Sequence, residues 1–373
     1  MERAIVVGGG VLGTMHALAL RRAGWEVIQL EADAAPRSAS LRNFGLIWVG
    51  GRRAGAELAA ALRARELWEA LAGDVPAIGF RPEGSLTVAL EPAALRVMEE
   101  FMGFPDAAGR GIELLGPAEV RRVNPAVCGP VLGALWCQRD AVVEPRAVLG
   151  AVRDHLTARG GYTFQPDTTV VEVAGATVSD HRGTTWPADL VIVATGAVHH
   201  GVRGVDLTAA PLRRVRLQML QTEPYPERLP TSLADADSLR YYPAYAAASL
   251  DTLPPQSPMA ARQHLQLLVA QRADGGLTIG DTHLYDEPFD FDLDEAPSAE
   301  LLGRASRILG RDLPPVARRW DGVYSQCTEP DALCYRNQPQ PGVWVVTGPG
   351  GRGMTCAPVI AEDTLTAAGV LPA

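Results

Sequence analysis

Residues 3–31 read RAIVVGGGVLGTMHALALRRAGWEVIQLE. The apolar run at 3–8 is short and continuous, which is typical of a strand buried in a parallel sheet. Behind it, apolar residues recur at helical spacing until Gly24, and a second strand-like stretch at 26–31 ends on an acidic residue. The order of strand, turn, helix and strand predicts a parallel α/β unit at the start of the chain.

Three glycines stand at the turn of this unit, Gly8, Gly10 and Gly13, with the spacing G-x-G-x-x-G. Glycine there permits a tight turn and lets a pyrophosphate approach the backbone at the N-terminus of the helix. Glu31, at the end of the second strand, has the place of a carboxylate that accepts a hydrogen bond from a ribose hydroxyl. The unit therefore predicts dinucleotide binding.

The rest of the chain alternates between helical and strand-like patterns. Leucines at helical spacing predict a packing helix at 54–72, and further patterns predict strands at 80–90, 133–143, 168–173 and 188–196 and a helix from 144 through His155. Between residues 210 and 325 the pattern changes to alternating strands, at 212–221 and 265–270, with proline-rich joints. This is typical of an antiparallel substrate domain. A last strand at 342–348 leads through a glycine-rich turn into the final helix.

Composition and charge exclude several classes of function. With 34 basic and 43 acidic residues the formal net charge is −9, so the basic patch of a nucleic-acid-binding protein is absent. No apolar run approaches the ~20 residues of a membrane span, and we expect no membrane partner. All basic residues other than histidine are arginine, which excludes a Schiff-base lysine.

Cysteine and histidine usage points to a protein without disulfides or a metal. The cysteines are odd in number and form no CxxC pair, which predicts reduced thiols and a cytoplasmic location. They are Cys128, Cys137, Cys327, Cys334 and Cys356. The pair His199 and His200 has no third ligand at metal spacing, so we expect no metal site.

Four motifs together resemble a known family. They are the N-terminal glycine fingerprint, Val-Glu-Pro-Arg at 143–146, Ala-Thr-Gly at 194–196 and the glycine-rich turn before the last helix. In this order they resemble the D-amino-acid oxidase, glycine oxidase and sarcosine oxidase superfamily of FAD-dependent oxidoreductases. Residues 40–48 and 277–283 also resemble a narrower branch that is proposed to oxidise aminophosphonates.

The resemblance implies an α/β fold with two parts. A discontinuous, Rossmann-like FAD-binding domain is expected at 1–80, 140–210 and 320–373, and an inserted substrate domain with a mixed or antiparallel sheet at 81–139 and 211–319. The residues implied to contact FAD, which we expect to be bound non-covalently, are Gly8, Gly10, Val11, Leu12, Gly13, Glu31, Ala32, Arg42, Asn43, Phe44, Gly45, Val170, Ala194, Thr195, Gly196, Gly351, Arg352, Gly353, Met354 and Thr355.

The chain departs from the family pattern at two places. Relatives clamp the substrate carboxylate with an arginine, and the matching position here is Tyr324, which counts against a simple α-amino acid. Sarcosine oxidase relatives tether FAD to a cysteine, and Cys327 is displaced from that position. Without a lysine, oxygen activation would fall to an arginine or a histidine, or the electrons would pass to another acceptor.

An anionic amine needs a cation beside the cofactor, and arginine suits a phosphonate because its planar fork donates two parallel hydrogen bonds. Arg42, Arg52 and Arg240 are the candidates, with a solvated surface position as the alternative for each. Tyrosines and one histidine are candidates to contact substrate, with packing as the alternative: Tyr242, Tyr324, Tyr335 and His283, the last also as a proton acceptor. The set we expect to be catalytic is His283, Tyr324, Arg240 and Tyr242.

These features predict an FAD-dependent enzyme that oxidises a small primary or secondary amine, with 2-aminoethylphosphonate or an N-methyl or hydroxy relative preferred. Hydride would pass to flavin N5, the imine would hydrolyse to an aldehyde, and O2 would reoxidise the flavin to give H2O2. One alternative is a glycine, sarcosine or D-amino acid oxidase. The other is a flavoprotein that serves as an electron-transfer or assembly partner. Oligomeric state is left open, a homo-oligomer included.

Overall fold

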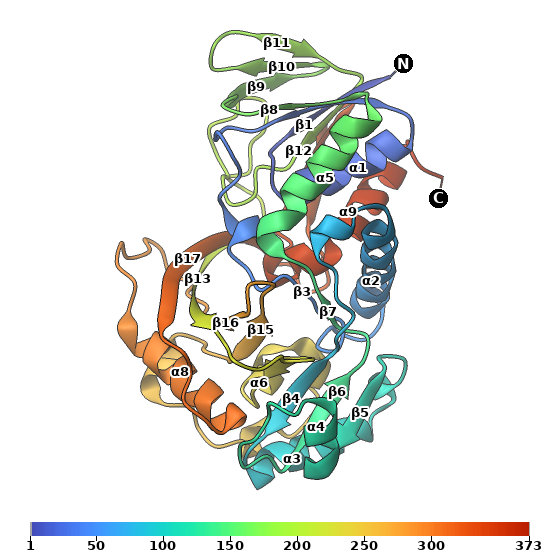
Figure 1. The fold of residues 1–373 in the computed structure, drawn as a ribbon. Helices are drawn as coiled ribbons and strands as arrows, with labels where there is room; N and C mark the ends of the chain where they lie inside the picture. Colours follow the sequence, from blue (N-terminus) through green and yellow to red (C-terminus); the bar gives the residue numbers. More distant parts are fainter. Residues whose placement is uncertain (1, 373) are drawn as a thin grey trace.

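A computed structural model describes residues 2–372, which form two large sheets and two small ones (Figure 1). The first sheet, in the upper part of Figure 1, has six strands and carries the N-terminal unit at its centre. In spatial order these strands are β18 (Tyr335–Gln340), β19 (Val343–Thr347), β12 (Leu190–Val193), β1 (Arg3–Val7), β2 (Glu26–Leu30) and β8 (Tyr162–Gln165). All neighbours pair in parallel except β18 with β19.

Strand β1 is buried on both faces, as its continuous apolar run predicts. Ala4 and Val6 pack against helices, whereas Ile5 and Val7 pack against a small three-stranded sheet. The helices are α1 (Val11–Arg22), α2 (Ala56–Asp74), α5 (Pro145–Arg159) and α9 (Gly353–Ala367), and the small sheet has the order β11 (Thr185–Pro187), β10 (Thr177–Asp180) and β9 (Val170–Ala174).

The second sheet has eight strands and is mixed, because β14 and β4 run in parallel while the other neighbours are antiparallel. Its spatial order is β17 (Val316–Cys327), β13 (Leu212–Pro224), β16 (Gly276–Gly280), β15 (Leu268–Gln271), β14 (Ser232–Ala234), β4 (Ser85–Ala89), β6 (Gly133–Cys137) and β5 (Ile112–Leu115). The α/β fold with a Rossmann-like unit and a mixed second sheet confirms the predicted fold class.

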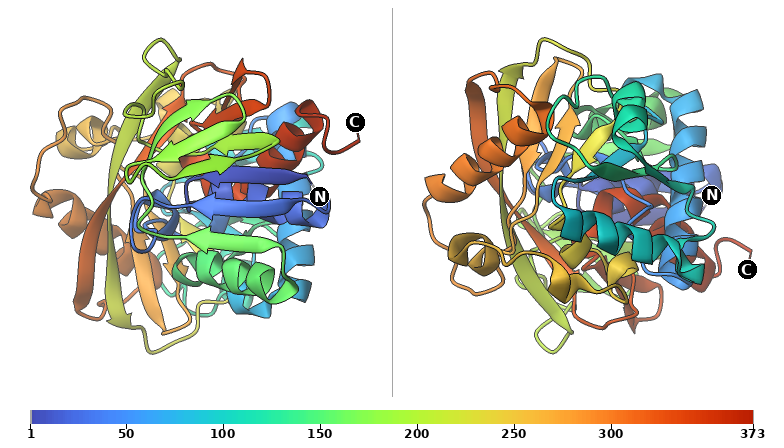
Figure 2. Two further views of the ribbon diagram at one scale, coloured as in Figure 1. Left: turned by 90° about the horizontal axis from the view of Figure 1, so that it is seen from above. Right: turned by 90° about the horizontal axis from the view of Figure 1, so that it is seen from below.

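The two faces of the second sheet have separate cores. One face packs with α3 (Pro92–Met102) and with aromatic residues of the loops, including Phe44, Trp48 and Tyr242. The other face packs against α4 (Pro117–Val123) and α8 (Glu295–Leu309) through an aliphatic core. Seen from below, α3 in teal and α8 in orange lie well apart (Figure 2). The short helices α6 (Ser238–Tyr241) and α7 (Pro258–Arg262) complete this half.

The stretch 133–143, predicted as one strand, forms two. Strand β6 ends at Cys137, and β7 (Ala141–Val142) pairs with β3 (Leu46–Ile47) in a separate two-stranded sheet. Asp140 in the intervening turn explains the break, because its buried carboxylate accepts hydrogen bonds from the backbone of Val49 and Gly50 and from the Ser85 hydroxyl. The turn therefore holds a hydrogen-bonding carboxylate that a continuous strand would not place there.

The expected division into two domains stays a prediction. The six-stranded and eight-stranded sheets draw on the segments assigned to each part, but strand β17 runs from Val316 to Cys327 across the expected boundary at 319/320. Among residues 2–372, no helix combines the length and apolar character needed to cross a bilayer.

Candidate active site

One large cavity lies where the carboxyl ends of the central strands meet the inner face of the second sheet. Its volume is about 1180 Å³. Val7 and Leu30, the last residues of β1 and β2, are among the residues that line it. Ligands of open parallel sheets bind at this edge, because the loops that follow neighbouring strands converge there. Leu217 and Met219 of β13 form part of the opposite wall.

The first glycine turn packs so closely against neighbouring backbone that no side chain fits. A Cβ on Gly8 would lie 2.3 Å from the carbonyl oxygen of Ala194, and Gly8 also has a φ of +112°. A Cβ on Gly13 would lie 2.1 Å from the carbonyl oxygen of Gly8. These contacts pack α1 against β1 and β12, and they direct the N-terminus of α1 at the cavity.

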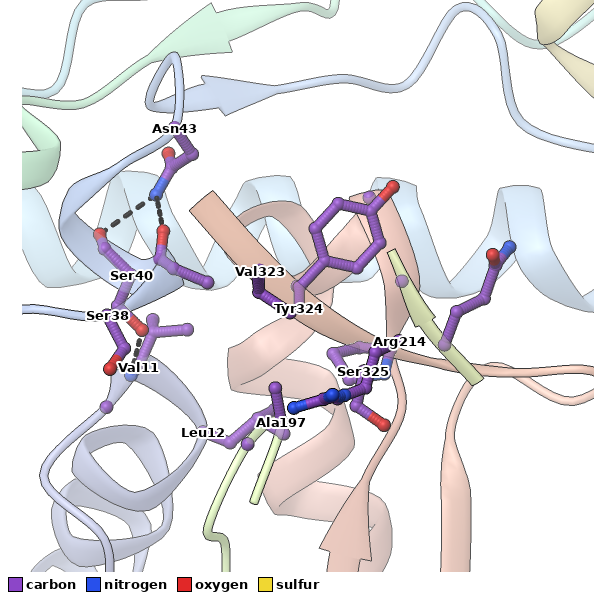
Figure 3. Close-up of a pocket in the computed structure, with 18 of the residues that line it drawn as sticks. Val11, Leu12, Ser38, Ser40, Asn43, Ala197, Arg214, Val323, Tyr324 and Ser325 are labelled. Carbon is purple, nitrogen blue, oxygen red and sulfur yellow. Dashed lines mark hydrogen bonds between the residues drawn. The ribbon is translucent and has the colours of Figure 1, made fainter. Parts of the chain in front are cut away.

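The carboxylate of Glu31 closes the same turn. Its oxygens accept hydrogen bonds from the backbone N–H of Gly9, at 2.6 Å, and of Asp33, at 3.0 Å. On the other flank, the Ser40 hydroxyl accepts from the backbone N–H of Val11 at 2.9 Å (Figure 3). The side chain of Asn43 in turn holds its own loop by donating to two backbone carbonyls. The loop after β2 is therefore fixed against the first helix.

A second glycine-rich turn, 350–353, leads into α9 from the opposite side. A Cβ on Gly351 would lie 3.5 Å from the hydroxyl oxygen of Tyr241 and 3.9 Å from that of Tyr324. The positive end of a long helix and two phenols thus converge on one part of the cavity.

Three tyrosines and a histidine form the adjoining wall. The hydroxyls of Tyr241 and Tyr324 hydrogen-bond to each other, and burial raises the pKa of both phenols. The rings of Tyr241 and His283 stack with centroids 4.3 Å apart, and Tyr242 stacks on Trp48 at 5.4 Å. Figure 3 shows the Tyr324 ring on the side of β17 opposite Ser325. The phenols stay neutral near pH 7 and therefore remain hydrogen-bond donors.

His283 forms a buried pair with Asp281. Its Nδ1 lies 3.2 Å from the carbonyl oxygen of His264 and must carry a proton to bond it, and its Nε2 lies 3.6 Å from Oδ2 of Asp281. Burial raises the pKa of the Asp281 carboxyl, and His283 opposes this rise. Gln266 donates to the same carboxyl at 3.3 Å. Because Nδ1 is engaged, a proton shared within this pair would lie between Nε2 of His283 and Oδ2 of Asp281.

The three arginines expected to clamp an anion are engaged within the protein. Arg240 donates to Oδ1 of Asp237 at 3.1 Å and to two backbone carbonyls, which uses all three of its nitrogens. Arg42 donates to the carbonyls of residues 37 and 321. Arg52 is buried, donates to the carbonyl of Trp48 at 2.8 Å, and lies 3.5 Å from Oγ1 of Thr355.

Most residues singled out in the sequence line this cavity. They are Gly8, Gly10, Val11, Leu12, Glu31, Ala32, Arg42, Asn43, Phe44, Val170, Ala194, Thr195, Gly196, Gly351, Arg352, Gly353 and Met354, together with His283, Tyr324, Arg240 and Tyr242.

Other expected residues lie behind the lining. Gly13 and Gly45 pack against backbone carbonyls, and the Thr355 hydroxyl donates to the carbonyl of Leu46 and accepts from the N–H of Trp48. Tyr335, a candidate for the pocket, packs on β18 against the core between the first sheet and the small sheet.

Sequence reasoning missed Tyr241, Asp281 and Gln266, which line the cavity together with His283. Tyr241 directly precedes the candidate Tyr242, and Asp281 lies within the 277–283 stretch. A buried carboxylate two residues from a candidate histidine is a signal that a search for acid–imidazole pairs would have found. No group of three or more metal-ligating side chains occurs within residues 2–372.

Comparisons with known proteins agree with this geometry. The model of the DAO family, described as FAD dependent oxidoreductase, matches residues 3–367. A protein of Rhizobium meliloti that is named as one subunit of an opine oxidase is 24% identical, covering 96% of this chain and 93% of its own length. Among solved structures, glycine oxidase from Geobacillus kaustophilus has a TM-score of 0.79 at 18% identity, covering 99% and 95% of the two chains. Iminodiacetate oxidase from Chelativorans sp. BNC1 has a TM-score of 0.75 at 19% identity, covering 100% and 96%.

Proposed function

Because the chain belongs to the DAO family of FAD-dependent oxidoreductases, with FAD as its cofactor, we propose that it oxidises the carbon–nitrogen bond of a small anionic amine. The preferred substrate is 2-aminoethylphosphonate or an N-methyl or hydroxy relative. The amine loses two electrons and becomes an imine, which water hydrolyses to an aldehyde and ammonia or an amine. The two electrons reduce O2 to H2O2, or pass to another acceptor.

The residues along one side of the cavity fit FAD. Protein atoms occupy the positions that a Cβ would take at Gly8 and Gly9, so the turn stays tight and the N-terminus of α1 faces the cavity, where it suits a pyrophosphate. The Glu31 carboxylate follows the end of β2, the place expected for a ribose contact. The turn at 350–353 offers backbone donors at the N-terminus of α9 to the far end of the cofactor. We expect the binding to be non-covalent.

Bound FAD supplies the acceptor for the hydrogen and two electrons removed from the carbon beside the nitrogen. The phenol groups of Tyr241 and Tyr324 orient the substrate by hydrogen bonds, since both stay protonated. Trp48, Tyr242 and Met219 exclude water from the same space. The pair of His283 and Asp281 takes up the proton of the ammonium form, so that the amine reacts in its neutral state.

The observation that carries the proposal is the wall beside the second glycine turn, in which Tyr241 contacts both His283 and Tyr324. Its two phenols are neutral hydrogen-bond donors, which supports an amine bound next to this turn. Tyr324 also occupies the position of the carboxylate-clamping arginine of relatives, which favours a substrate other than a simple α-amino acid.

Anaerobic bleaching of the flavin absorbance tests this function. The panel contains 2-aminoethylphosphonate, its N-methyl form, glycine, sarcosine and D-alanine. Bleaching by the phosphonates alone is the expected result. Bleaching by the carboxylates alone would replace the substrate by that of a glycine, sarcosine or D-amino acid oxidase, and no bleaching by any amine would overturn amine oxidation.

A second candidate follows from the name of a relative. The Rhizobium meliloti protein is named as a subunit of an opine oxidase, and it matches almost the whole chain. If this chain likewise works in a complex, its flavin would pass electrons to another chain. Light scattering of the purified protein, followed by bleaching with and without an added electron acceptor, distinguishes an enzyme that works alone from one that works in a complex. The cytoplasmic location stays a prediction from the cysteine pattern.

A further inference from the structure

Eight arginines line the cavity, and within the described residues all but one have a carboxylate oxygen within 4 Å. The seven pairs are Arg37 with Asp33, Arg42 with Asp321, Arg52 with Glu57, Arg53 with Asp331, Arg214 with Glu287, Arg240 with Asp237, and Arg352 with Glu57. The eighth is Arg213. Within residues 2–372, this exposed arginine is the one at the cavity that has no carboxylate oxygen within 4 Å.

The side chain of Arg213 is nevertheless held in place. Its Nε donates to Oε1 of Gln326 at 3.0 Å, and its guanidinium carbon lies 3.9 Å from the centroid of the Tyr285 ring. Tyr285 is itself fixed by an edge contact with His264 at 5.1 Å. The cation–π contact orients the guanidinium over the ring, and the hydrogen bond to Gln326 uses only its Nε.

The strand register places Arg213 on the cavity side of the second sheet. It lies opposite Gln326 on β17, and Val215 lies opposite Tyr324. Side chains two residues apart on a strand share a face, so Arg213 and Tyr324 project to the same side, about one strand repeat apart. Arg213, Tyr285, His283 and Tyr324 are thus neighbours along one wall.

We propose that Arg213, stacked on Tyr285, binds a terminal oxyanion of the substrate, with phosphonate preferred over carboxylate. The proposal rests on the proposed oxidation of an anionic amine and adds its anchoring residue. The amine then lies at the tyrosine wall and the oxyanion at the Arg213 end, so the substrates are amines with an acidic group remote from the reacting carbon. The terminal NH2 groups of a fixed guanidinium match two oxygens of such a group.

Calorimetric titration of the FAD-loaded protein tests this anchor without turnover. The probes are ethylphosphonate and propionate, which lack an amine, and ethylamine, which lacks an oxyanion. The variants are R213Q, R213K and, as a matched control on the neighbouring strand, R319Q, whose side chain pairs with Glu295. We expect R213Q to weaken ethylphosphonate binding by about tenfold or more. R213K should lie between the two, and R319Q should match the wild type.

Two results would overturn the anchor: equal affinity of wild type and R213Q for both oxyanions, or no binding of either oxyanion by the wild type. Dependence of propionate alone on Arg213 supports the anchor and assigns it to carboxylates. The outcome is separate from that of the bleaching panel. Arg213-dependent binding without bleaching leaves the anchor standing and removes amine oxidation, whereas bleaching with unchanged affinity does the reverse.

Discussion

The cofactor half of the cavity is built mainly from backbone, and the substrate half mainly from side chains. At the first turn, Gly8 and Gly13 leave no room for a Cβ, and the contacts are made by carbonyl and amide groups. On the opposite wall, the contacts are rings and carboxyls, from Tyr241 to Asp281. Backbone geometry constrains the residue type to glycine, whereas a side-chain wall can change its chemistry one residue at a time.

The largest effect should come from breaking the backbone half. In Gly8→Ala, the new Cβ would meet the Ala194 carbonyl oxygen at 2.3 Å, at a φ that alanine rarely adopts. We expect a loss of at least about 3 kcal/mol of stability and no retained flavin. Bound flavin per chain and urea unfolding measure this. Gly150→Ala is the control, since its site on α5 has open space and alanine favours helix. Full flavin content in Gly8→Ala would contradict the backbone account.

The next effect concerns an ionic cluster that links the start of α5, beside the first sheet, to the end of β15 in the second sheet. Glu144 precedes α5 and accepts from Arg81 of the neighbouring segment at 2.6 Å, while the buried Arg272 beside β15 lies 3.9 Å away. Burial lowers the pKa of Arg272 to about 10. Glu144→Gln should therefore cost about 2 kcal/mol, because it removes a charged hydrogen-bond acceptor of Arg81 and leaves Glu83 as the paired carboxylate of this cluster. Urea unfolding measures the loss, and Glu172→Gln, in an exposed pair with Arg203, should change little. A similar loss of unfolding free energy in both variants would show that the cluster contributes no more stability than an exposed ion pair.

On the side-chain half, Tyr324→Phe removes one hydroxyl of the hydrogen-bonded phenol pair. Turnover of the preferred substrate should fall by about 10- to 100-fold, as expected for one hydrogen bond to a reacting group. Flavin content should be unchanged, which separates the two halves of the cavity. Stopped-flow reduction of the flavin measures the rate, and Tyr335→Phe, which packs elsewhere, is the control. An unaltered rate would place the substrate away from this wall.

A smaller effect follows from the raised pKa of Asp281. Burial raises this pKa above that of the unfolded chain, so the folded protein binds more protons between the two values, and stability falls as pH rises through that window. The variant Asp281→Asn has no titrating carboxyl at this position, so its stability should not show this fall with rising pH. The unfolding free energy of the wild type should therefore drop relative to that of the variant as pH rises from the ordinary carboxyl pKa upward. Urea unfolding at several pH values measures it, and parallel pH curves would exclude a titrating Asp281.

The smallest effect concerns Cys327, which lines the cavity. If FAD is non-covalent, acid denaturation releases it into the supernatant in both wild type and Cys327→Ser. Absorbance of the two fractions measures this. Yellow colour in the wild-type pellet that disappears in the variant would instead establish a covalent bond to this sulfur.

The backbone half could be predicted from the sequence because its residues are local. Gly8, Gly10, Gly13 and Glu31 lie within one strand–helix–strand unit, and the spacing alone relates them to one ligand. The second turn, at 350–353, is predictable because it has the same arrangement of glycines directly before a helix. The fold class followed from these two units and from the change of pattern after residue 210.

The substrate half could not be predicted in the same way. Arg213, Tyr241, Asp281 and Tyr324 come from four segments, and only the strand order and register bring them together. Arg240 illustrates the difficulty: its neighbours in sequence suggest a site, but its guanidinium binds Asp237 and two carbonyls. Asp237 lies only three residues before Arg240, but no local pattern indicates that the carbonyls of Leu250 and Pro254 occupy its other two nitrogens.

The paired strands β13 and β17 run side by side for 13 and 12 residues, a ribbon of about 40 Å. Leu217 and Met219, which lie two residues apart on one face of this ribbon, line the cavity. A lineage of such proteins can therefore explore new substrates by exchanging alternate positions on this ribbon, with the cofactor cradle inherited unchanged.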